Sequence, residues 1–216
     1  MIAVPFGLNL SRLGDRSGSI QRRLSPIRWA APVLVSNLKY TPLETTRLSL
    51  EMPRADHAAA IFDSFSSDPD VTRYLRWAPA RSVADSEAAM TGRLSSLKTG
   101  AELSWILVLK SDGEVVGSLS IWPRGSEAEL GFALARNVWG QGFAAEAGHA
   151  VIEWLRESNQ FRRVWAACDA ENPRSRRVLE KLGLQYERLA ENYAVHPNLS
   201  SEPRDCHVLG LELVAV

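Results

Sequence analysis

Two glycines, Gly140 and Gly142, stand on either side of a glutamine where the hydrophobic period of the chain changes. Residues 127–135 alternate apolar and other residues, as a strand with one buried face does, and residues 142–157 place theirs on one helical stripe. Glycine lets main-chain N–H groups approach a ligand, and the first N–H groups of a helix lie unpartnered at its positive end. The segment therefore predicts a phosphate or pyrophosphate site, or, as the simpler alternative, a tight strand-to-helix turn that binds nothing.

A second polar group opens the helix predicted over residues 173–182. Asn172 suits the N-cap, Pro173 the first helical position and Gly183 the left-handed residue after the helix. Ser175, in the first turn, can point its hydroxyl past the helix end toward whatever lies beside the strand predicted over 163–168. Capping alone would also explain Asn172, so its role in binding stays open here.

The elements that must position these groups alternate along the chain. Strands are predicted over 46–52, 105–109, 115–121, 127–135, 163–168, 184–193 and 206–214, and helices over 56–65, 68–76, 82–98, 142–157 and 173–182. Ser82 and Asp85 form a predicted capping box, and Asp68 with Pro69 begins a short helix. The order predicts an α/β (α+β) fold, a mixed sheet of about seven strands with helices on both faces and a crossover through 142–157.

Composition narrows the class of protein. The chain has 216 residues, 45% of them hydrophobic and 23% charged, and its formal net charge is zero, which argues against an extended nucleic-acid surface. No apolar run approaches the roughly 20 residues of a membrane span. Cys168 and Cys206 lack metal-like spacing, and the four histidines form no ligand pattern, so we expect reduced thiols, no metal and a cytoplasmic location.

The first forty residues differ from the rest. They carry six Lys or Arg residues and a single acid, and they show no sustained period. We expect residues 1–43 to be an irregular basic extension and residues 44–216 to be the domain. The alternative is an organelle transit peptide, which has the same Arg- and Ser-rich, acid-poor composition.

Two motifs at this spacing resemble the GNAT superfamily of acyl-CoA-dependent N-acyltransferases, in particular its ribosomal-protein N-acetyltransferase branch. They are WGQGFAAEA at 139–147, and NPRS at 172–175 continuing to KLGL at 181–184. The resemblance spans about residues 44–214. It implies a mostly antiparallel sheet, acetyl-CoA as co-substrate and an amine as acceptor. We expect a monomer or homodimer and, from the charge and hydropathy given above, neither a nucleic-acid nor a membrane partner.

The resemblance also implies where the cofactor binds. Main-chain N–H groups at 141–144 would hold the pyrophosphate of coenzyme A. The pantetheine arm would lie between the strands at 127–135 and 163–168 and bond their backbones, while Asn172 would bond the arm or hold the loop beside it. The cofactor-binding residues predicted in this way are Leu134, Trp139, Gln141, Gly142, Phe143, Ala144, Asn172 and Ser175.

The same resemblance assigns chemical roles. Ser175 would protonate the leaving thiolate, because Leu179 stands where many members of the superfamily have a tyrosine. A carboxylate suits the base that takes the proton of the amine, directly or through water. Glu129, on the strand face of Gly131 and Ala133, is the first choice, with an exposed strand glutamate as the alternative reading; Glu191 and Tyr193 are second choices.

The acceptor is the least determined part of this prediction. Trp77 resembles the aromatic residue that lines the acceptor pocket in this branch, and Tyr193 is a further substrate-binding candidate. The acceptor is predicted to be a protein N-terminal amine, with a small amine as the alternative, acetylated by direct transfer without a covalent intermediate on Cys168. Two remoter readings are a non-catalytic acyl-CoA-binding module and a nicotinamide enzyme, in which GxGxxA at 140–145 would hold a dinucleotide and Asp169 its ribose.

Overall fold

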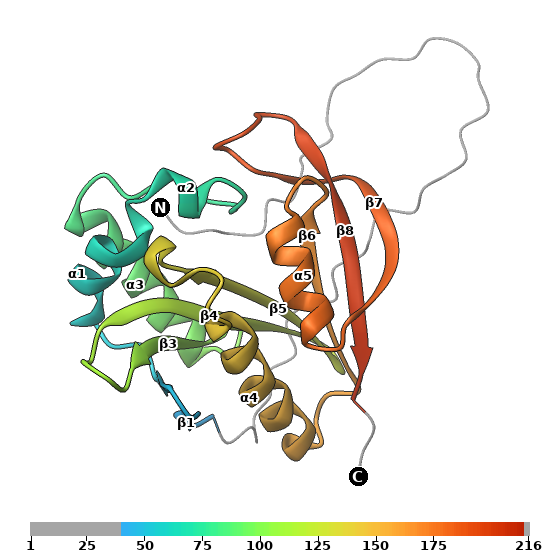
Figure 1. The fold of residues 1–216 in the computed structure, drawn as a ribbon, viewed down its shortest axis with the longest axis horizontal. Helices are drawn as coiled ribbons and strands as arrows, with labels where there is room; N and C mark the ends of the chain where they lie inside the picture. The colour runs from blue at the N-terminus through green and yellow to red at the C-terminus, as the bar shows by residue number, and fades with distance from the viewer. Residues whose placement is uncertain (1–39, 214–216) are drawn as a thin grey trace.

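The computed structural model describes residues 40–213 and shows one mixed sheet of eight strands with helices on both faces (Figure 1). The strands lie in the order β1-β2-β3-β4-β5-β6-β8-β7, so the last strand of the chain is inserted between β6 and β7. All neighbours are antiparallel except β5 and β6. The strands are β1 (Leu43–Glu44), β2 (Leu48–Glu51), β3 (Leu103–Leu109), β4 (Val115–Arg124), β5 (Glu127–Leu134), β6 (Arg163–Asp169), β7 (Gln185–Val195) and β8 (Pro203–Glu212).

Helices α1 (His57–Ile61), α2 (Pro69–Thr72) and α3 (Val83–Lys98) cover one side, with a wider π-type turn, η1 (Phe62–Ser66), after α1. Asp68 caps α2 by accepting from the N–H of Asp70 at 2.8 Å. Ser82 and Asp85 form the expected capping box of α3. These local signals fix where the helices start, and η1 packs against both α3 and β4.

Helices α4 (Phe143–Ser158) and α5 (Pro173–Lys181) lie on the opposite side of the sheet (Figure 1). The indole of Trp154 in α4 packs edge-on against Trp105 of β3, with ring centroids 5.2 Å apart. Tyr40 completes this aromatic cluster at 5.0 Å from Trp105, whose indole N–H donates to the carbonyl of Thr41. Burial of these large rings fixes α4 against the first half of the sheet.

The structure confirms the predicted fold class and most predicted elements. It has eight strands where about seven were expected, because residues 43–44 add a short edge strand. Tyr40 and Thr41, which precede the predicted start of the domain at residue 44, both contact Trp105 of the core. The rest of the predicted extension, residues 1–39, lies outside the described residues. Within the described chain no helix is long and apolar enough to cross a membrane.

The β4–β5 pair predicts a specific stability effect. A Cβ on Gly117 would lie 2.5 Å from the main-chain oxygen of Ala133, which cannot move without disturbing the pairing. We expect Gly117→Ala to lower the free energy of unfolding by about 1–3 kcal/mol, measured by urea titration. Gly92→Ala is the matched control: nothing lies within 4 Å of its Cβ position in α3. It should raise stability by up to about 1 kcal/mol through helix propensity, and equal effects at both positions would contradict the steric argument.

Candidate active site

Strands β5 and β6 pair over only three residues and then diverge. Residues 127–129 of β5 are in register with residues 163–165 of β6. Beyond that point β5 pairs only with β4, and β6 pairs only with β8. Main-chain N–H and C=O groups of the two strands therefore line a wedge that opens toward their carboxyl ends. An extended ligand with amide groups can pair with such edges as an added strand would.

The glycine loop lies at the open end of this wedge, between β5 and α4. Gly140 has φ +79° and Gly142 has φ +86°, a left-handed conformation that strains residues with a side chain. Gly142 is the N-cap of α4 and has no side chain with which to cap it. The first N–H groups of α4 are therefore left to an external acceptor, which fits a phosphate group.

The other loop residues that are predicted to bind the cofactor determine the shape of this phosphate cradle, the glycine loop with the first N–H groups of α4. The indole N–H of Trp139 donates to the carbonyl of Leu134 at 2.8 Å, which folds the loop back onto the end of β5. The side-chain amide of Gln141 donates to the carbonyl of Asn137 at 3.1 Å, which turns this side chain back onto the loop. Phe143 is buried beneath the start of the helix, and Ala144 is half-buried.

An ion pair that the sequence analysis missed ties this loop to β2. Glu146 accepts from the hydroxyl of Thr45 at 2.7 Å and from the main-chain N–H of Arg47 at 2.8 Å. The Arg47 guanidinium lies 2.6 Å from the same carboxylate and donates to the carbonyl of Gln141 at 3.0 Å. Burial raises the pKa of Glu146, but the hydrogen bonds from Thr45 and Arg47 outweigh it, and the net shift is downward. The partners lie far apart in sequence, so no local pattern signals the contact.

The predicted cap of α5 is present beside the end of β6. The side-chain oxygen of Asn172 accepts from the N–H of Ser175 at 3.1 Å. Ser175 is half-buried and contacts Cys168, the penultimate residue of β6. Burial raises the pKa of Cys168 to about 11, which makes its thiol a poor nucleophile. This position places Ser175 at the β6 edge of the wedge.

Glu129 lies at the closed end of the wedge. It is the last β5 residue paired with β6, opposite Trp165, and it is only 5% exposed. Strand alternation puts its side chain on the face of the sheet opposite α4 and α5. One oxygen of its carboxylate lies 3.4 Å from a guanidinium nitrogen of Arg76, and the other lies 3.6 Å from a guanidinium nitrogen of Arg124. Glu129 is therefore a buried, charge-compensated carboxylate and not an exposed strand residue.

Tyr193 reaches the same cluster from β7. The β7–β8 register shifts between Ala190 and Ala194, where Asn192 adopts φ +49° and donates its N–H to Asp205 at 2.9 Å. Such a bulge re-aims a side chain. The guanidinium of Arg76 lies 5.5 Å from the Tyr193 ring. Burial, with the negative charge of Glu129, raises the pKa of Tyr193 to about 12, so its phenol stays protonated. Glu191, the other second choice for the base, is exposed on β7.

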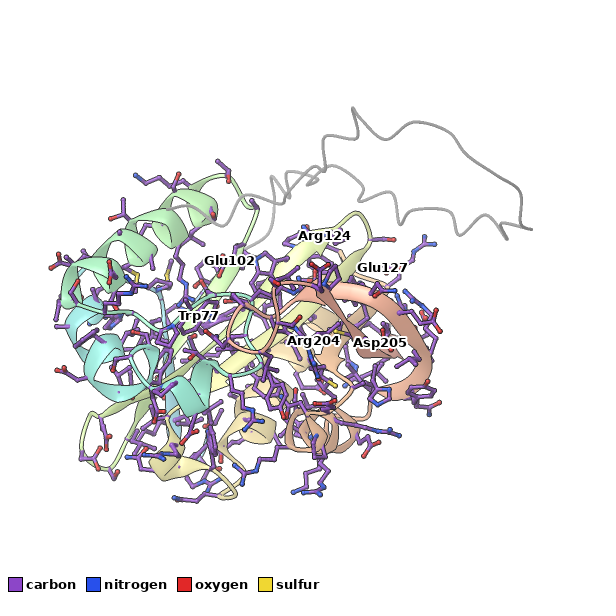
Figure 2. The ribbon with its side chains drawn as sticks, turned by 90° about the horizontal axis from the view of Figure 1, so that it is seen from above. Trp77, Glu102, Arg124, Glu127, Arg204 and Asp205 are labelled. Carbon is purple, nitrogen blue, oxygen red and sulfur yellow. The ribbon has the colours of Figure 1, made fainter. Side chains whose placement is uncertain are left out.

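Two loops border this cluster. Trp77 is 38% exposed and follows α2. The side-chain amide of Asn198, in the turn between β7 and β8, donates to the carbonyls of Thr72 at 2.6 Å and Trp77 at 2.9 Å. Figure 2 shows Trp77 on the side of the first helices, whereas Arg124 comes from the end of β4 and Arg204 from β8. These two hydrogen bonds join the two loops directly.

A buried charge network that the sequence did not signal holds the β7–β8 turn. Asp169, at the end of β6, is 1% exposed and lies 2.8 Å from Nδ1 of His196 and 2.7 Å from Nε of Arg204. Burial raises the pKa of Asp169, but hydrogen bonds, led by that from Arg204, outweigh it and the net shift is downward. This carboxylate is occupied by protein partners, so it does not present the free acid that a ribose-binding role would need. In residues 40–213 no cluster of His, Cys, Asp or Glu is placed to hold a metal ion.

Comparisons with known proteins identify this arrangement. Residues 47–185 match the model of the acetyltransferase (GNAT) domain. The chain belongs to the GNAT acetyltransferase family. It is 30% identical over 155 residues to the uncharacterized N-acetyltransferase p20 of Bacillus licheniformis, which covers 70% of this chain and 86% of that protein.

Two solved structures share the fold of this GNAT enzyme. RimL, a ribosomal L7/L12 alpha-N-protein acetyltransferase in complex with coenzyme A, has a TM-score of 0.71 at 18% identity and covers 80% of this chain and 98% of its own. MccE, the microcin C7 self-immunity acetyltransferase in complex with acetyl-CoA and AMP, has a TM-score of 0.69 at 17% identity and covers 77% and 93%. The match to the GNAT domain and to an N-acetyltransferase shows an acetyl-CoA-dependent acyltransferase, which sets the nicotinamide reading aside.

The glycine loop predicts a matched pair of variants. Gly142→Ala places a side chain in a left-handed position beside the first N–H groups of α4, so we expect acetyl-CoA affinity to fall by about tenfold in isothermal titration. Gly113→Ala is the control, because Gly113 has φ +79° but lies in the β3–β4 turn. Both variants should show similar small losses of thermal stability from backbone strain. Equal losses of affinity would show that strain, and not the cradle, is responsible.

Proposed function

We propose that this enzyme acetylates the N-terminal amine of a protein. The observation that carries the proposal is the cluster of Glu129, Arg76 and Tyr193 at the closed end of the wedge, on the face opposite α4. The cofactor loop lies at the open end of the wedge. The acetyl donor and the amine therefore approach the point where β5 and β6 separate from opposite sides of the sheet. RimL, which shares the fold, is described as an alpha-N-protein acetyltransferase.

The mouth of the pocket supports a polymeric acceptor. The side chain of Arg76 is 49% exposed and Trp77 is 38% exposed, and both lie at the rim that Asn198 joins. An amine at the end of a polypeptide can reach Glu129 while its following residues contact this rim. A small amine would use only the buried part of the cluster. MccE, with the same fold and AMP bound, is the reason to test small amines as well.

The residues of the wedge divide the proton transfers between them. Acetyl-CoA, when bound, supplies the activated acetyl group as a thioester. Glu129 accepts a proton from the amine, directly or through water, and the guanidinium groups of Arg76 and Arg124 lie beside its carboxylate. Ser175 holds a proton on Oγ at the β6 edge for the departing sulfur, and main-chain N–H groups of β5 orient the acetyl carbonyl.

An acceptor panel tests the substrate class. Short peptides with free N-termini should be acetylated with kcat/KM at least about tenfold above that for polyamines, free amino acids and amino-sugar antibiotics, because only peptides reach the rim. Thiol release and mass spectrometry measure turnover. Peptides with blocked N-termini but free lysine side chains are the control and should be inert. Preferential turnover of a small amine would replace the protein acceptor in this proposal.

The two proton-transfer roles predict different pH profiles. Glu129→Gln should lower kcat by about 10²- to 10⁴-fold near neutral pH. The defect should shrink above about pH 8, where an α-amine deprotonates unaided. Ser175→Ala should also lower kcat, but by a factor that stays constant over this range because a serine hydroxyl does not titrate. Neither variant should change acetyl-CoA affinity more than Gly142→Ala does; a pH-independent Glu129→Gln defect would argue for a structural role.

A further inference from the structure

Arg47 crosses from the start of β2 to the cofactor loop and is held there on three sides. Its Nε and one terminal nitrogen lie 2.7 and 2.6 Å from the same carboxylate oxygen of Glu146. Its other terminal nitrogen donates to the carbonyl of Gln141 at 3.0 Å. The carbon of the guanidinium lies 4.1 Å from the centre of the Phe143 ring. These contacts fix both the plane and the rotation of the group.

The contacts leave one edge of the guanidinium for another acceptor. The group has five N–H bonds in a fixed plane, and the contacts with Glu146 and Gln141 engage one on each nitrogen. Each terminal nitrogen carries a second N–H bond that has no hydrogen-bond partner among residues 40–213, and we refer to the side of the group formed by these two nitrogens as its outer edge. Paired N–H groups on one edge match two oxygens of a phosphate. The side chain is 44% exposed, so a ligand can reach this edge.

The edge lies beside the phosphate cradle. A Cβ on Gly142 would stand 3.6 Å from a terminal nitrogen of Arg47, so the missing side chain keeps the guanidinium close to the N-cap of α4. The carboxylate of Glu146 does not occupy the position of the ligand, because the hydroxyl of Thr45 and the main-chain N–H of Arg47 hold that carboxylate in place.

We propose that Arg47 binds the pyrophosphate of acetyl-CoA through this outer edge and that Glu146 positions it. Main-chain N–H groups of the cofactor loop and the side chain of Arg47 then bind the same pyrophosphate. The inference concerns the cofactor and not the acceptor, so a failed acceptor panel leaves it standing.

Isothermal titration of the full chain with coenzyme A and with 3′-dephospho-coenzyme A tests the proposal. Arg47→Gln should weaken binding of both ligands by about tenfold, because both retain the pyrophosphate. Arg47→Lys, which keeps the charge and most of the stem, should also weaken both, since one ammonium cannot hold Glu146, Gln141 and a phosphate together. Glu146→Gln should cause a smaller loss, because the positive charge remains but is less well oriented.

Arg54→Gln is the matched control: Arg54 pairs with Glu51 and Asp56, away from the loop, and its loss should leave both affinities unchanged. The phosphorus-31 resonances of the bound pyrophosphate should move in the Arg47 variants and not in Arg54→Gln, which a purely structural effect on folding would not produce. Unchanged affinity of Arg47→Gln and Arg47→Lys for both ligands would overturn the proposal. A loss confined to coenzyme A would also overturn it, since the contacted group would then be the 3′-phosphate.

Discussion

The divergence of β5 and β6 is the constraint on which the rest of the structure depends. Buried main-chain groups must be paired, and these two strands satisfy each other over only residues 127–129 and 163–165. Each strand then turns to a different neighbour, β4 or β8, so the sheet divides in two. The insertion of β8 next to β6 makes this possible, because it gives β6 an antiparallel partner along its whole length, beside its short parallel pairing with β5. The cofactor loop lies at the open end of the wedge between β5 and β6, and Glu129 lies at its closed end.

Paired charges then fix the segments that the sheet alone does not position. Glu146 with Arg47 joins α4 to β2, Glu129 with Arg76 joins β5 to the loop after α2, and Asp169 with Arg204 joins β6 to β8. A buried carboxylate is costly unless it is paired and hydrogen-bonded, so each pair strongly favours one arrangement of its two segments. Such pairs add little net stability, but they determine geometry. In this enzyme each of them lies at an edge of the wedge.

Local signals made part of this architecture predictable. The change of hydrophobic period at Gly142 and the caps at Asp68, Ser82 and Asn172 act within a few residues, and the structure shows each of them in place. The partners of the charged groups were not predictable, because Arg47 and Glu146 are 99 residues apart and Asp169 and Arg204 are 35 apart. The bulge that turns Tyr193 inward likewise depends on Asp205 of the next strand. Sequence periodicity describes an element, whereas the site is made of contacts between elements.

In the proposed function, different segments of the chain bind the cofactor and the acceptor. In the proposed mechanism the loop before α4, the start of α5 and the edges of β5 and β6 bind the cofactor. The acceptor side is built from other segments, the loop after α2 with Arg76 and Trp77 and the β7–β8 turn with Asn198, joined to each other by side-chain hydrogen bonds to main-chain carbonyls. Substitutions there change the pocket without moving the wedge, because the sheet and α4 are held by their own contacts. In the proposed function acceptor specificity therefore depends on these two loops, so that a change between a protein and a small-molecule acceptor requires no change in the fold.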